Sequence, residues 1–282
     1  MKNIILDTDI GTDSDDIGAL SILCNLHRQR KINLIAVTSC TSTVEPVATV
    51  DAICSWYGVT VPCGNSKVPY GDDDQHGGYA RAIAKAYPRD VGAVPDAVKV
   101  LRKALLKGNV TLVTIGPLNN VARLIKSPAD EISDKTGAEL FAENVKELYS
   151  MAGSFANDWA EWNVKEDIAA MQVVAKHVAC PWTLVPFEAG VIVKTGANFL
   201  ADVDSPMKLG YFVHNGGPRE SWDPITAYCA AVKCLPTSSW GKLQVDDSGV
   251  TTLTGSKGNA RFVKADFDVK EVTEKLEKLM VI

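Results

Sequence analysis

Five aspartates lie within ten residues near the N-terminus, in the run DTDIGTDSDD: they are Asp7, Asp9, Asp13, Asp15 and Asp16. Carboxylates packed this closely repel one another unless a cation or shared protons offset their charge. One or two aspartates would suffice to cap a helix and complement its dipole, so capping alone does not explain five. Because every donor is an oxygen, the run favours a hard divalent cation, Ca²⁺ or Mg²⁺, over a merely solvated acidic loop.

The acidic run lies between two predicted elements. Residues 4–6 form an apolar stretch that is typical of a buried strand, and the apolar residues within 17–23 fit a helix. The acids therefore lie where a strand ends and a helix begins. We expect Asp9 and Asp16 to meet across the turn around Gly11.

Strand and helix patterns alternate along most of the remaining chain. Strands are predicted at 32–37, 59–62, 109–114, 148–151 and 182–185, and helices at 47–57, 95–106 and 167–176. This alternation predicts an α/β fold with a mostly parallel central sheet flanked by helices on both faces. The last forty residues predict a small hairpin, formed by KLQVDDSGVTTLTG and ARFVKADF, and a closing amphipathic helix. No linker or repeat is evident, so we predict a single domain spanning residues 1–282.

Further polar residues follow the predicted strands, where ligands of parallel sheets bind. The turn after residue 114 exposes the carbonyl of Ile115, a competent Ca²⁺ ligand, although these residues by themselves favour an ordinary strand-to-helix turn. Glu161 and Asn163 flank Trp162, a pattern that fits recognition of a polyol. Asp223, in SWDPITAY, is either a further carboxylate for the cation or only a helix N-cap.

Composition argues against several classes of function. The net charge of -5 and the pI of about 5.5 disfavour nucleic acid or an anionic membrane as a partner. No apolar run approaches the length of a membrane span, and we expect no signal peptide, because the sequence starts directly with the first predicted strand. The seven cysteines contain no CxxC pair, which favours free thiols in a reducing compartment. We therefore predict a cytoplasmic protein with a small-molecule substrate.

The histidines and tryptophans give weaker indications. No HxH or HxxxH pair occurs, so a zinc site is not expected. His76 is the one histidine beside glycines in a long loop, residues 64–78, and we favour it for ligand contact. Trp159, Trp162 and Trp222 could stack on a flat ligand, although a single tryptophan more often belongs to the core.

Taken in order, these motifs resemble the Ca²⁺-dependent nucleoside hydrolases, the inosine-uridine preferring nucleoside N-ribohydrolase superfamily. The signature of that family is DTDxG followed by DD, and it stands here as DTDIGTDSDD, two residues longer than its commonest form. The resemblance continues through HG at 76–77, GPLNN at 116–120, MAG at 151–153, EWN at 161–163 and WDP at 222–224. It implies a nucleoside hydrolase-like fold with a Rossmann-like core.

The resemblance also implies a role for each residue. Ca²⁺ would be held by Asp9, Asp16, Asp223 and the main-chain carbonyl of Ile115. The catalytic residues would be Asp9, as the general base for the attacking water, and Asp223. Asp15 would bind the ribose hydroxyls, and the remaining substrate contacts would come from His76, Asn157, Glu161, Asn163 and Trp222. The implied reaction hydrolyses a ribonucleoside to ribose and free base, and members of the family are commonly dimers or tetramers.

Position 222 departs from the commonest pattern of the family, in which a histidine precedes the last aspartate and protonates the leaving base. Trp222 stands there instead, as in the purine-specific branch, where a tryptophan stacks on the base. The resemblance therefore favours purine nucleosides as substrates and a role in purine salvage or nucleoside catabolism.

Two other interpretations remain open. A phosphatase of the haloacid dehalogenase type also places DxD after its first strand and uses Mg²⁺, but it leaves Asp15, Asp16 and the SWDP motif unexplained. The missing histidine motivates the other alternative, a Ca²⁺-dependent nucleoside or ribose binder that has lost catalysis.

Overall fold

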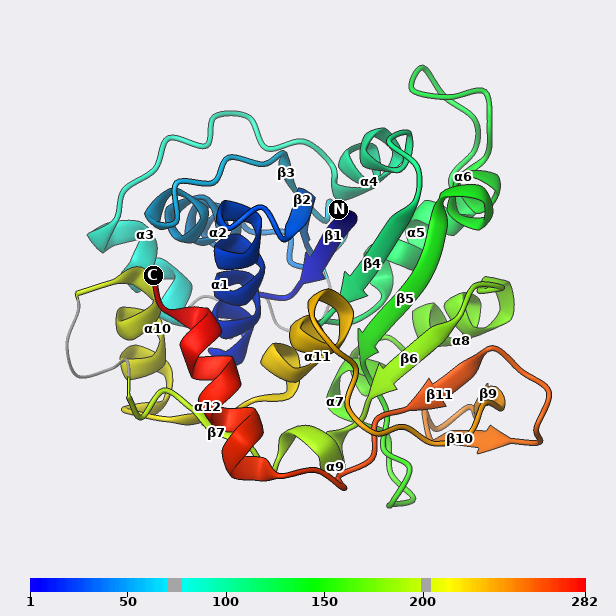
Figure 1. Ribbon diagram of the computed structural model, residues 1–282. Coiled ribbons are helices and arrows are strands. Elements are labelled where there is room, and N and C mark those ends of the chain that lie inside the picture. Colours follow the sequence, from blue (N-terminus) through cyan, green and yellow to red (C-terminus); the bar gives the residue numbers. More distant parts are fainter. Residues whose placement is uncertain (70–77, 199–203) are drawn as a thin grey trace.

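The chain is described by a computed structural model that covers residues 1–69, 78–198 and 204–282. Seven strands form the central sheet in the order β11-β6-β5-β4-β1-β2-β3 (Figure 1). Every neighbouring pair in this sheet is parallel. The strands are β1 (Lys2–Thr8), β2 (Ile32–Ser39), β3 (Cys63–Asn65), β4 (Val110–Thr114), β5 (Val145–Met151), β6 (Trp182–Val185) and β11 (Ala260–Phe262). The parallel α/β fold predicted from the sequence is confirmed.

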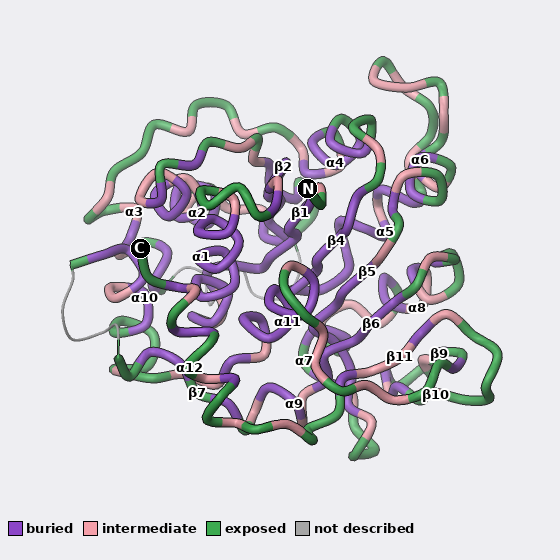
Figure 2. The backbone as a smooth tube through the Cα atoms, in the orientation of Figure 1, coloured by how far each residue is buried: buried purple, intermediate pink, exposed green. Residues whose placement is uncertain are grey.

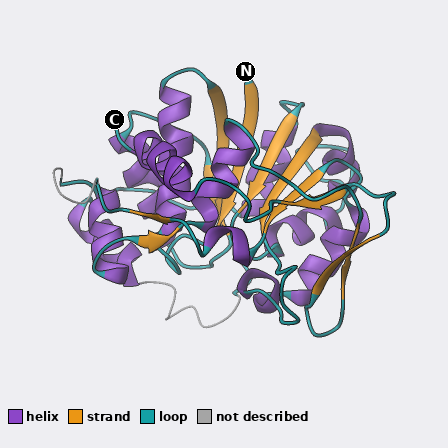
Figure 3. Cartoon of the chain, turned by 60° about the horizontal axis from the view of Figure 1, so that its bottom comes forward, coloured by secondary structure: helices purple, strands orange, loops and turns teal. Residues whose placement is uncertain are grey.

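The strands are apolar on both faces because helices cover both sides of the sheet. Ile4 and Leu6 of β1 belong to one core cluster, and Ile5 between them belongs to the other. Successive side chains of a strand point to opposite faces, so this division places one cluster on each side of the sheet. Figure 2 shows the central strands buried, and Figure 3 shows them side by side with helices around them.

Two groups of helices supply these two clusters. The first cluster takes residues from α1 (Asp15–Arg28), α2 (Glu45–Trp56), α3 (Gly78–Ala86), α9 (Phe187–Gly190), α10 (Pro206–Asn215), α11 (Trp222–Ala231) and α12 (Val269–Met280). The second takes residues from α4 (Ala97–Leu105), α5 (Asn119–Lys126), α6 (Gly137–Asn144), α7 (Trp162–Glu166) and α8 (Ile168–His177). Among the described helices, none is long and apolar enough to cross a membrane.

Two small antiparallel sheets lie outside the main sheet. One pairs β7 (Lys194–Thr195) with β8 (Arg219–Glu220), and the other is a hairpin of β9 (Lys242–Val245) and β10 (Thr251–Thr254). The predicted C-terminal hairpin is confirmed for β9 and β10. The prediction was wrong for β11, which instead pairs in parallel with β6 and extends the main sheet. It thereby covers an edge of β6 that would otherwise leave backbone groups without a partner.

Other predicted boundaries also differ from the structure. The strand predicted at 59–62 was wrong: β3 begins at Cys63, since Pro62 has no N–H group for a strand ladder and only its carbonyl pairs with Val37. The helix predicted from residue 95 begins at Ala97, because Asp96 is extended and caps it by accepting from the Val98 N–H at 2.7 Å.

Helices α1 and α11 pack closely where Gly18 faces α11. A Cβ atom at Gly18 would lie 3.0 Å from Cγ of Pro224 and 2.6 Å from the hydroxyl of Tyr211. A larger residue would therefore overlap Tyr211 of α10 and press on Pro224 of α11, and glycine lets the helices pack as they do. Because α1 begins with Asp15 and Asp16, this contact also positions two of the predicted site residues.

Candidate active site

The acidic run lies at the carboxyl edge of the sheet, where β1 is flanked by β2 on one side and β4 on the other. The chain proceeds in opposite directions from this point, which makes it the switch point at which α/β sheets bind ligands. Gly11 has a φ of 121°, a conformation that L side chains rarely adopt, and it lets the chain turn sharply from β1 toward α1. The predicted location of the site is thus where the topology opens a crevice.

Three carboxylates converge in this crevice. Oxygen atoms of Asp15, Asp16 and Asp223 all lie within 4.8 Å of one another, and all three residues are buried. The Asp223 N–H donates to Oδ2 of Asp15 at 3.0 Å, and the Thr8 hydroxyl donates to Oδ1 of Asp16. Residues more than 200 positions apart in the chain therefore share one small volume.

The electrostatics of these acids fit a cation. Burial, followed by the charges of neighbouring aspartates, raises the pKa of Asp15, Asp16 and Asp223 well above the usual range. Three buried carboxylates are stable as anions only if positive charge offsets their desolvation and mutual repulsion. Their all-oxygen donor set suits a hard divalent ion such as Ca²⁺.

Asp9 lies beside this cluster. It is 3% exposed, and the Thr12 hydroxyl donates to its Oδ2 at 2.9 Å. Burial is the main cause of the raised pKa of Asp16, and the negative charge of Asp9 is the next largest. A Cβ atom at Gly116 would lie 2.7 Å from Oδ1 of Asp9, so the glycine after β4 is required for the carboxylate to occupy this position.

A cavity of about 370 Å³ opens onto these acids. Its lining contains Asp9, Thr12, Asp13, Asp15, Asp16, Ile115, Met151, Glu161, Trp162, Asn163, Phe187, Arg219, Trp222 and Asp223. Eight residues predicted from the sequence thus lie around one cavity: Asp9, Asp15, Asp16, Ile115, Glu161, Asn163, Trp222 and Asp223. The cavity combines carboxylates with aromatic and aliphatic surface, as a ligand with a polar and a flat part requires.

Glu161 and Asn163 are fixed by the start of α7. Glu161 is the N-cap of this helix and accepts from the Asn163 N–H at 3.0 Å, and burial raises its pKa to about 7. The Asn163 amide donates to the carbonyls of Ile115 at 3.2 Å and Met151 at 3.1 Å. The carbonyl predicted as a Ca²⁺ ligand therefore already accepts one hydrogen bond, and it retains a second lone pair.

Trp222 forms an aromatic part of the wall. Its indole N–H donates to the carbonyl of Phe187 at 2.8 Å, and the two rings lie 5.7 Å apart between centroids. Trp159 packs edge-on against Phe187 at 4.9 Å but does not line the cavity. Cζ of Arg219 lies 5.2 Å from the centroid of the Trp222 ring.

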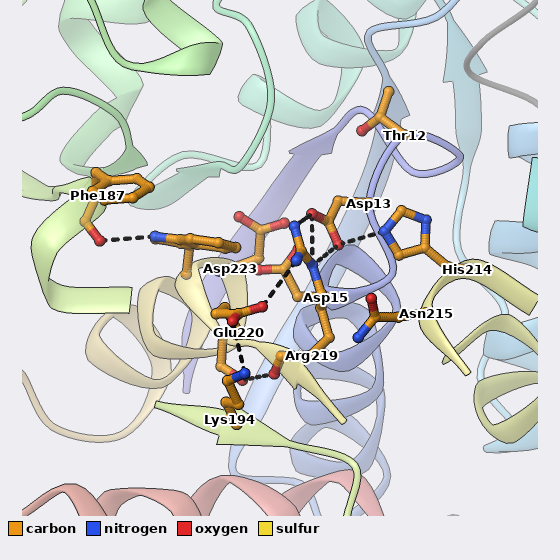
Figure 4. A network of polar contacts seen from close by, with 12 residues as sticks. Thr12, Asp13, Asp15, Phe187, Lys194, His214, Asn215, Arg219, Glu220 and Asp223 are labelled. Atoms are coloured by element: carbon orange, nitrogen blue, oxygen red, sulfur yellow. Dashed lines mark hydrogen bonds and ion pairs between the residues drawn. The ribbon is translucent and has the colours of Figure 1, made fainter. Parts of the chain in front are cut away.

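A polar network lies at the rim of the cavity and was not predicted from the sequence. It is formed by Asp13, His214, Arg219 and Glu220 (Figure 4). Arg219 donates from Nε to both carboxylate oxygens of Asp13, at 2.9 and 3.0 Å, and from Nη1 to Glu220 at 2.8 Å. Nε2 of His214 lies 3.3 Å from Oδ1 of Asp13. The available signals were the extra length of the acidic signature, which contains Asp13, and an arginine three residues before Trp222.

Some predicted residues lie elsewhere. His76 lies outside the described residues. Asn157 is exposed, is absent from the cavity lining, and donates to the Ser154 hydroxyl at 3.2 Å. The N-cap alternative for Asp223 was wrong, because Ser221 is the N-cap and Asp223 lies inside the first turn of α11.

Comparisons with solved structures show similarity over nearly the whole chain. The effector protein XOO4466 is 14% identical with a TM-score of 0.73, and the match covers 99% of this chain and 92% of that one. The type III effector protein XopQ, solved in complex with adenosine diphosphate ribose, is 15% identical with the same TM-score and coverage. At this identity the likeness shows the fold alone. No curated protein matches the chain.

The comparison with protein families is more specific. The sequence profile of the inosine-uridine preferring nucleoside hydrolases matches residues 4–265, which include every described residue of the cavity lining. The phosphatase alternative gains no support from these comparisons. The chain belongs to the inosine-uridine preferring nucleoside hydrolase family.

Proposed function

We propose that this protein hydrolyses the N-glycosidic bond of ribonucleosides, with Ca²⁺ as cofactor and purine nucleosides as the preferred substrates. Membership in the family supports N-glycosidic hydrolysis as the general reaction. The observation that carries the proposal is the convergence of Asp15, Asp16 and Asp223 within 4.8 Å in a cavity that Asp9 also lines. That arrangement brings Asp16 and Asp223 together as oxygen ligands for a cation, with Asp15 and Asp9 beside them.

Four groups would hold the ion: the carboxylates of Asp9, Asp16 and Asp223 and the carbonyl of Ile115. Bound Ca²⁺ would polarise a coordinated water and make its proton easier for a neighbouring carboxylate to remove. Asp15 would instead hold the ribose hydroxyls, and the Asp223 N–H that donates to it at 3.0 Å fixes its orientation for this task.

Asp9 would take the proton of the attacking water. Thr12 holds its Oδ2 at 2.9 Å, which orients the carboxylate in a crevice that excludes most solvent. As the bond from C1′ to the base breaks, positive charge develops on the ribose, and the surrounding carboxylates stabilise it. Trp222 would stack on the base, because it is a partly exposed aromatic residue of the cavity lining and directly precedes Asp223.

A second candidate function is binding of a riboside without hydrolysis. XopQ has a similar fold and was solved with adenosine diphosphate ribose, and this chain has a tryptophan where many family members have the histidine that protonates the base. A binder would keep the acid cluster and the stacking wall but release no ribose.

A turnover panel separates the two functions. Inosine, guanosine, adenosine, uridine and cytidine are each incubated with the protein in the presence of Ca²⁺ or of EDTA, and reducing sugar is measured. We expect release of ribose from the purine nucleosides with Ca²⁺ and none with EDTA. Calorimetric binding of inosine without release of ribose over hours would instead support the binder.

The remaining expectations from the family resemblance can be measured separately. We propose a homodimer or homotetramer, to be checked by light scattering coupled to size exclusion. We also propose a cytoplasmic location and a role in purine salvage or nucleoside catabolism, which a fluorescent fusion and growth on inosine as a purine source would test.

A further inference from the structure

Arg219 introduces a positive charge into a cavity lined by six carboxylates, those of Asp9, Asp13, Asp15, Asp16, Glu161 and Asp223. It is the one basic side chain among the described residues of the lining. Cation binding does not require it, because a guanidinium has no lone pair to offer a metal. Its presence therefore calls for a different explanation.

The guanidinium is held rigidly. Nε donates to both oxygens of Asp13, Nη2 donates to Oδ2 of Asp13, and Nη1 donates to Glu220 at 2.8 Å. Glu220 is itself paired with Lys194 at 3.0 Å, and Arg219 lies on β8, which pairs with β7. Figure 4 shows Arg219 between Asp13 and Glu220, with His214 also contacting Asp13. The side chain therefore loses little further freedom when a ligand binds.

These contacts leave two donors available. A guanidinium has five N–H groups, and the contacts above use one each on Nε, Nη2 and Nη1. Among the described residues, none accepts from the second N–H of Nη1 or of Nη2. Each of the two Nη nitrogens thus keeps one N–H without an acceptor among the described residues, and both nitrogens are bonded to Cζ, so they can offer a fork to two neighbouring acceptor atoms.

We infer that this fork recognises the O6 and N7 atoms of a 6-oxopurine base, so that Arg219 selects inosine and guanosine over adenosine. The inference rests on the proposed function of the same cavity. Arginine pairs with the O6 and N7 edge of guanine in this bidentate manner, and hypoxanthine carries the same two acceptors. Adenine has an amino group at position 6, which would meet the fork with a donor. Cζ of Arg219 lies over the Trp222 ring, 5.2 Å from its centroid, so a base that packs against the part of Trp222 left open to the cavity lies next to the guanidinium.

Charge favours a base edge over a phosphate as the occupant. Both offer paired acceptors to a guanidinium. The lining holds six carboxyl groups against one arginine, so acidic groups are in surplus. A phosphate dianion would be repelled by this surplus, whereas a neutral purine edge would not.

The same contact would assist departure of the base. In the hydrolysis, the water oxygen forms a bond to C1′, the bond from C1′ to N9 breaks, and its electron pair passes to the purine while the water proton passes to Asp9. Negative charge spreads from N9 toward N7 and O6, where the fork donates. Arg219 keeps its protons, and the departing base takes one from solvent. The fork thus supplies the charge stabilisation that a histidine at position 222 would otherwise provide by protonation.

The test compares Arg219→Lys with the wild type on base analogues. Lysine keeps the charge but loses the fork. The substrates are inosine, 7-deazainosine, which lacks the N7 acceptor, purine riboside, which lacks O6, and p-nitrophenyl riboside, whose leaving group needs no assistance. We expect kcat/KM for inosine, relative to p-nitrophenyl riboside, to fall by about 10- to 100-fold in the variant. We also expect the wild type, but not the variant, to prefer inosine to both purine analogues.

Arg261→Lys is the matched control. Cζ of Arg261 lies 4.5 Å from the ring of Trp240 and its Nε donates to Thr183, so it is also an arginine stacked on a tryptophan, but outside the cavity lining. We expect this variant to retain the wild-type ratios. Calorimetric titration with hypoxanthine and adenine adds a measurement independent of turnover, in which Arg219→Lys should weaken only hypoxanthine binding.

Four outcomes decide the matter. An equal loss for inosine and p-nitrophenyl riboside would overturn the inference and leave Arg219 a structural residue. An unchanged inosine ratio would also overturn it. A wild-type preference for inosine 5′-monophosphate that disappears in Arg219→Lys would assign the fork to phosphate instead. If the wild type hydrolyses no riboside but the variant still loses hypoxanthine binding, the proposed hydrolysis fails and the recognition by Arg219 stands.

Discussion

Asp13 and Asp16 lie three residues apart in one acidic run, yet their surroundings are opposite. At Asp13, burial acts to raise the pKa, but hydrogen bonds from His214 and Arg219 and the arginine charge outweigh it and hold the pKa well below the usual range. At Asp16, burial and the charges of Asp9 and Asp15 raise the pKa. The protein supplies its own cation, Arg219, to the rim acid Asp13, whereas we propose that the inner acids, Asp9, Asp15, Asp16 and Asp223, take an external one. Acidic clusters are therefore better judged by which members have an internal partner than by their number.

Asp9→Asn is the strongest test of the inner acids. Loss of the base should lower kcat on inosine by about 1,000-fold, the scale of general base catalysis, while an oxygen ligand remains. Turnover and circular dichroism are measured together, with Asp90→Asn, an exposed acid outside the cavity lining, as control. A variant with near-normal kcat and native structure would remove Asp9 from the mechanism.

Two other buried acids, Asp7 and Glu161, predict how the stability of the protein depends on pH. Burial raises the pKa of Asp7 to about 6 and of Glu161 to about 7, above their ordinary values of 3.8 and 4.5. Between these ordinary and raised values the native chain binds more protons than the unfolded chain, so its free energy of unfolding falls as pH rises from about 4.5 to 7. Asp13 adds nothing in this window, because its native pKa and its ordinary value of 3.8 both lie below it.

Chelated protein should therefore melt at a higher temperature at pH 5 than at pH 7.5. At pH 7.5, Ca²⁺ at one hundred times its Kd should restore about 2.7 kcal/mol. Calorimetry with and without Ca²⁺ measures both effects, and Glu161→Gln should flatten the pH dependence. A melting temperature that rises with pH and does not change when Ca²⁺ is added would contradict the view that the inner acids require an external cation.

Asp13→Asn tests the rim acid. Arg219 would lose its main charged partner, so the free energy of unfolding should fall by about 1–3 kcal/mol. Ca²⁺ should raise the melting temperature of the variant by the same increment as in the wild type, since this acid already has an internal partner. The control is Asp51→Asn, whose exposed ion pair with Arg89 should contribute less than about 1 kcal/mol. A loss that Ca²⁺ repairs would place Asp13 among the metal ligands.

Trp222→Ala has the smallest expected effect. It tests the residue that joins the rim network to the buried acids, because Trp222 contacts Arg219 and directly precedes Asp223. Stacking on the larger ring would be lost, so kcat/KM should fall about tenfold more for inosine than for uridine. Trp240→Ala, a partly exposed tryptophan outside the cavity lining, is the control. Equal losses for the two substrates would argue against stacking on the base.

Local sequence signals predicted the parts of the molecule that depend on local chemistry. The apolar run at 182–185 is β6 with the same bounds, and the acids after β1 lie at the carboxyl edge as expected. The partner of β11 could not be predicted, because a three-residue strand has no periodicity that specifies its neighbour. The pairing of Asp13 with Arg219 joins residues 206 positions apart and depends on how α1 and β8 meet in the folded chain.

The close approach at Gly18 has a consequence for how such a pocket can be altered. Asp15 and Asp16 belong to α1, whereas Asp223 and Trp222 belong to α11, and Gly18 lies at the contact between these helices. An added methyl group there would overlap the hydroxyl of Tyr211 and press on Cγ of Pro224, so it would disturb the packing behind the three carboxylates without touching any of them. A substitution at residue 18 is therefore expected to alter the proposed ion site from behind, while every residue of the cavity lining stays the same.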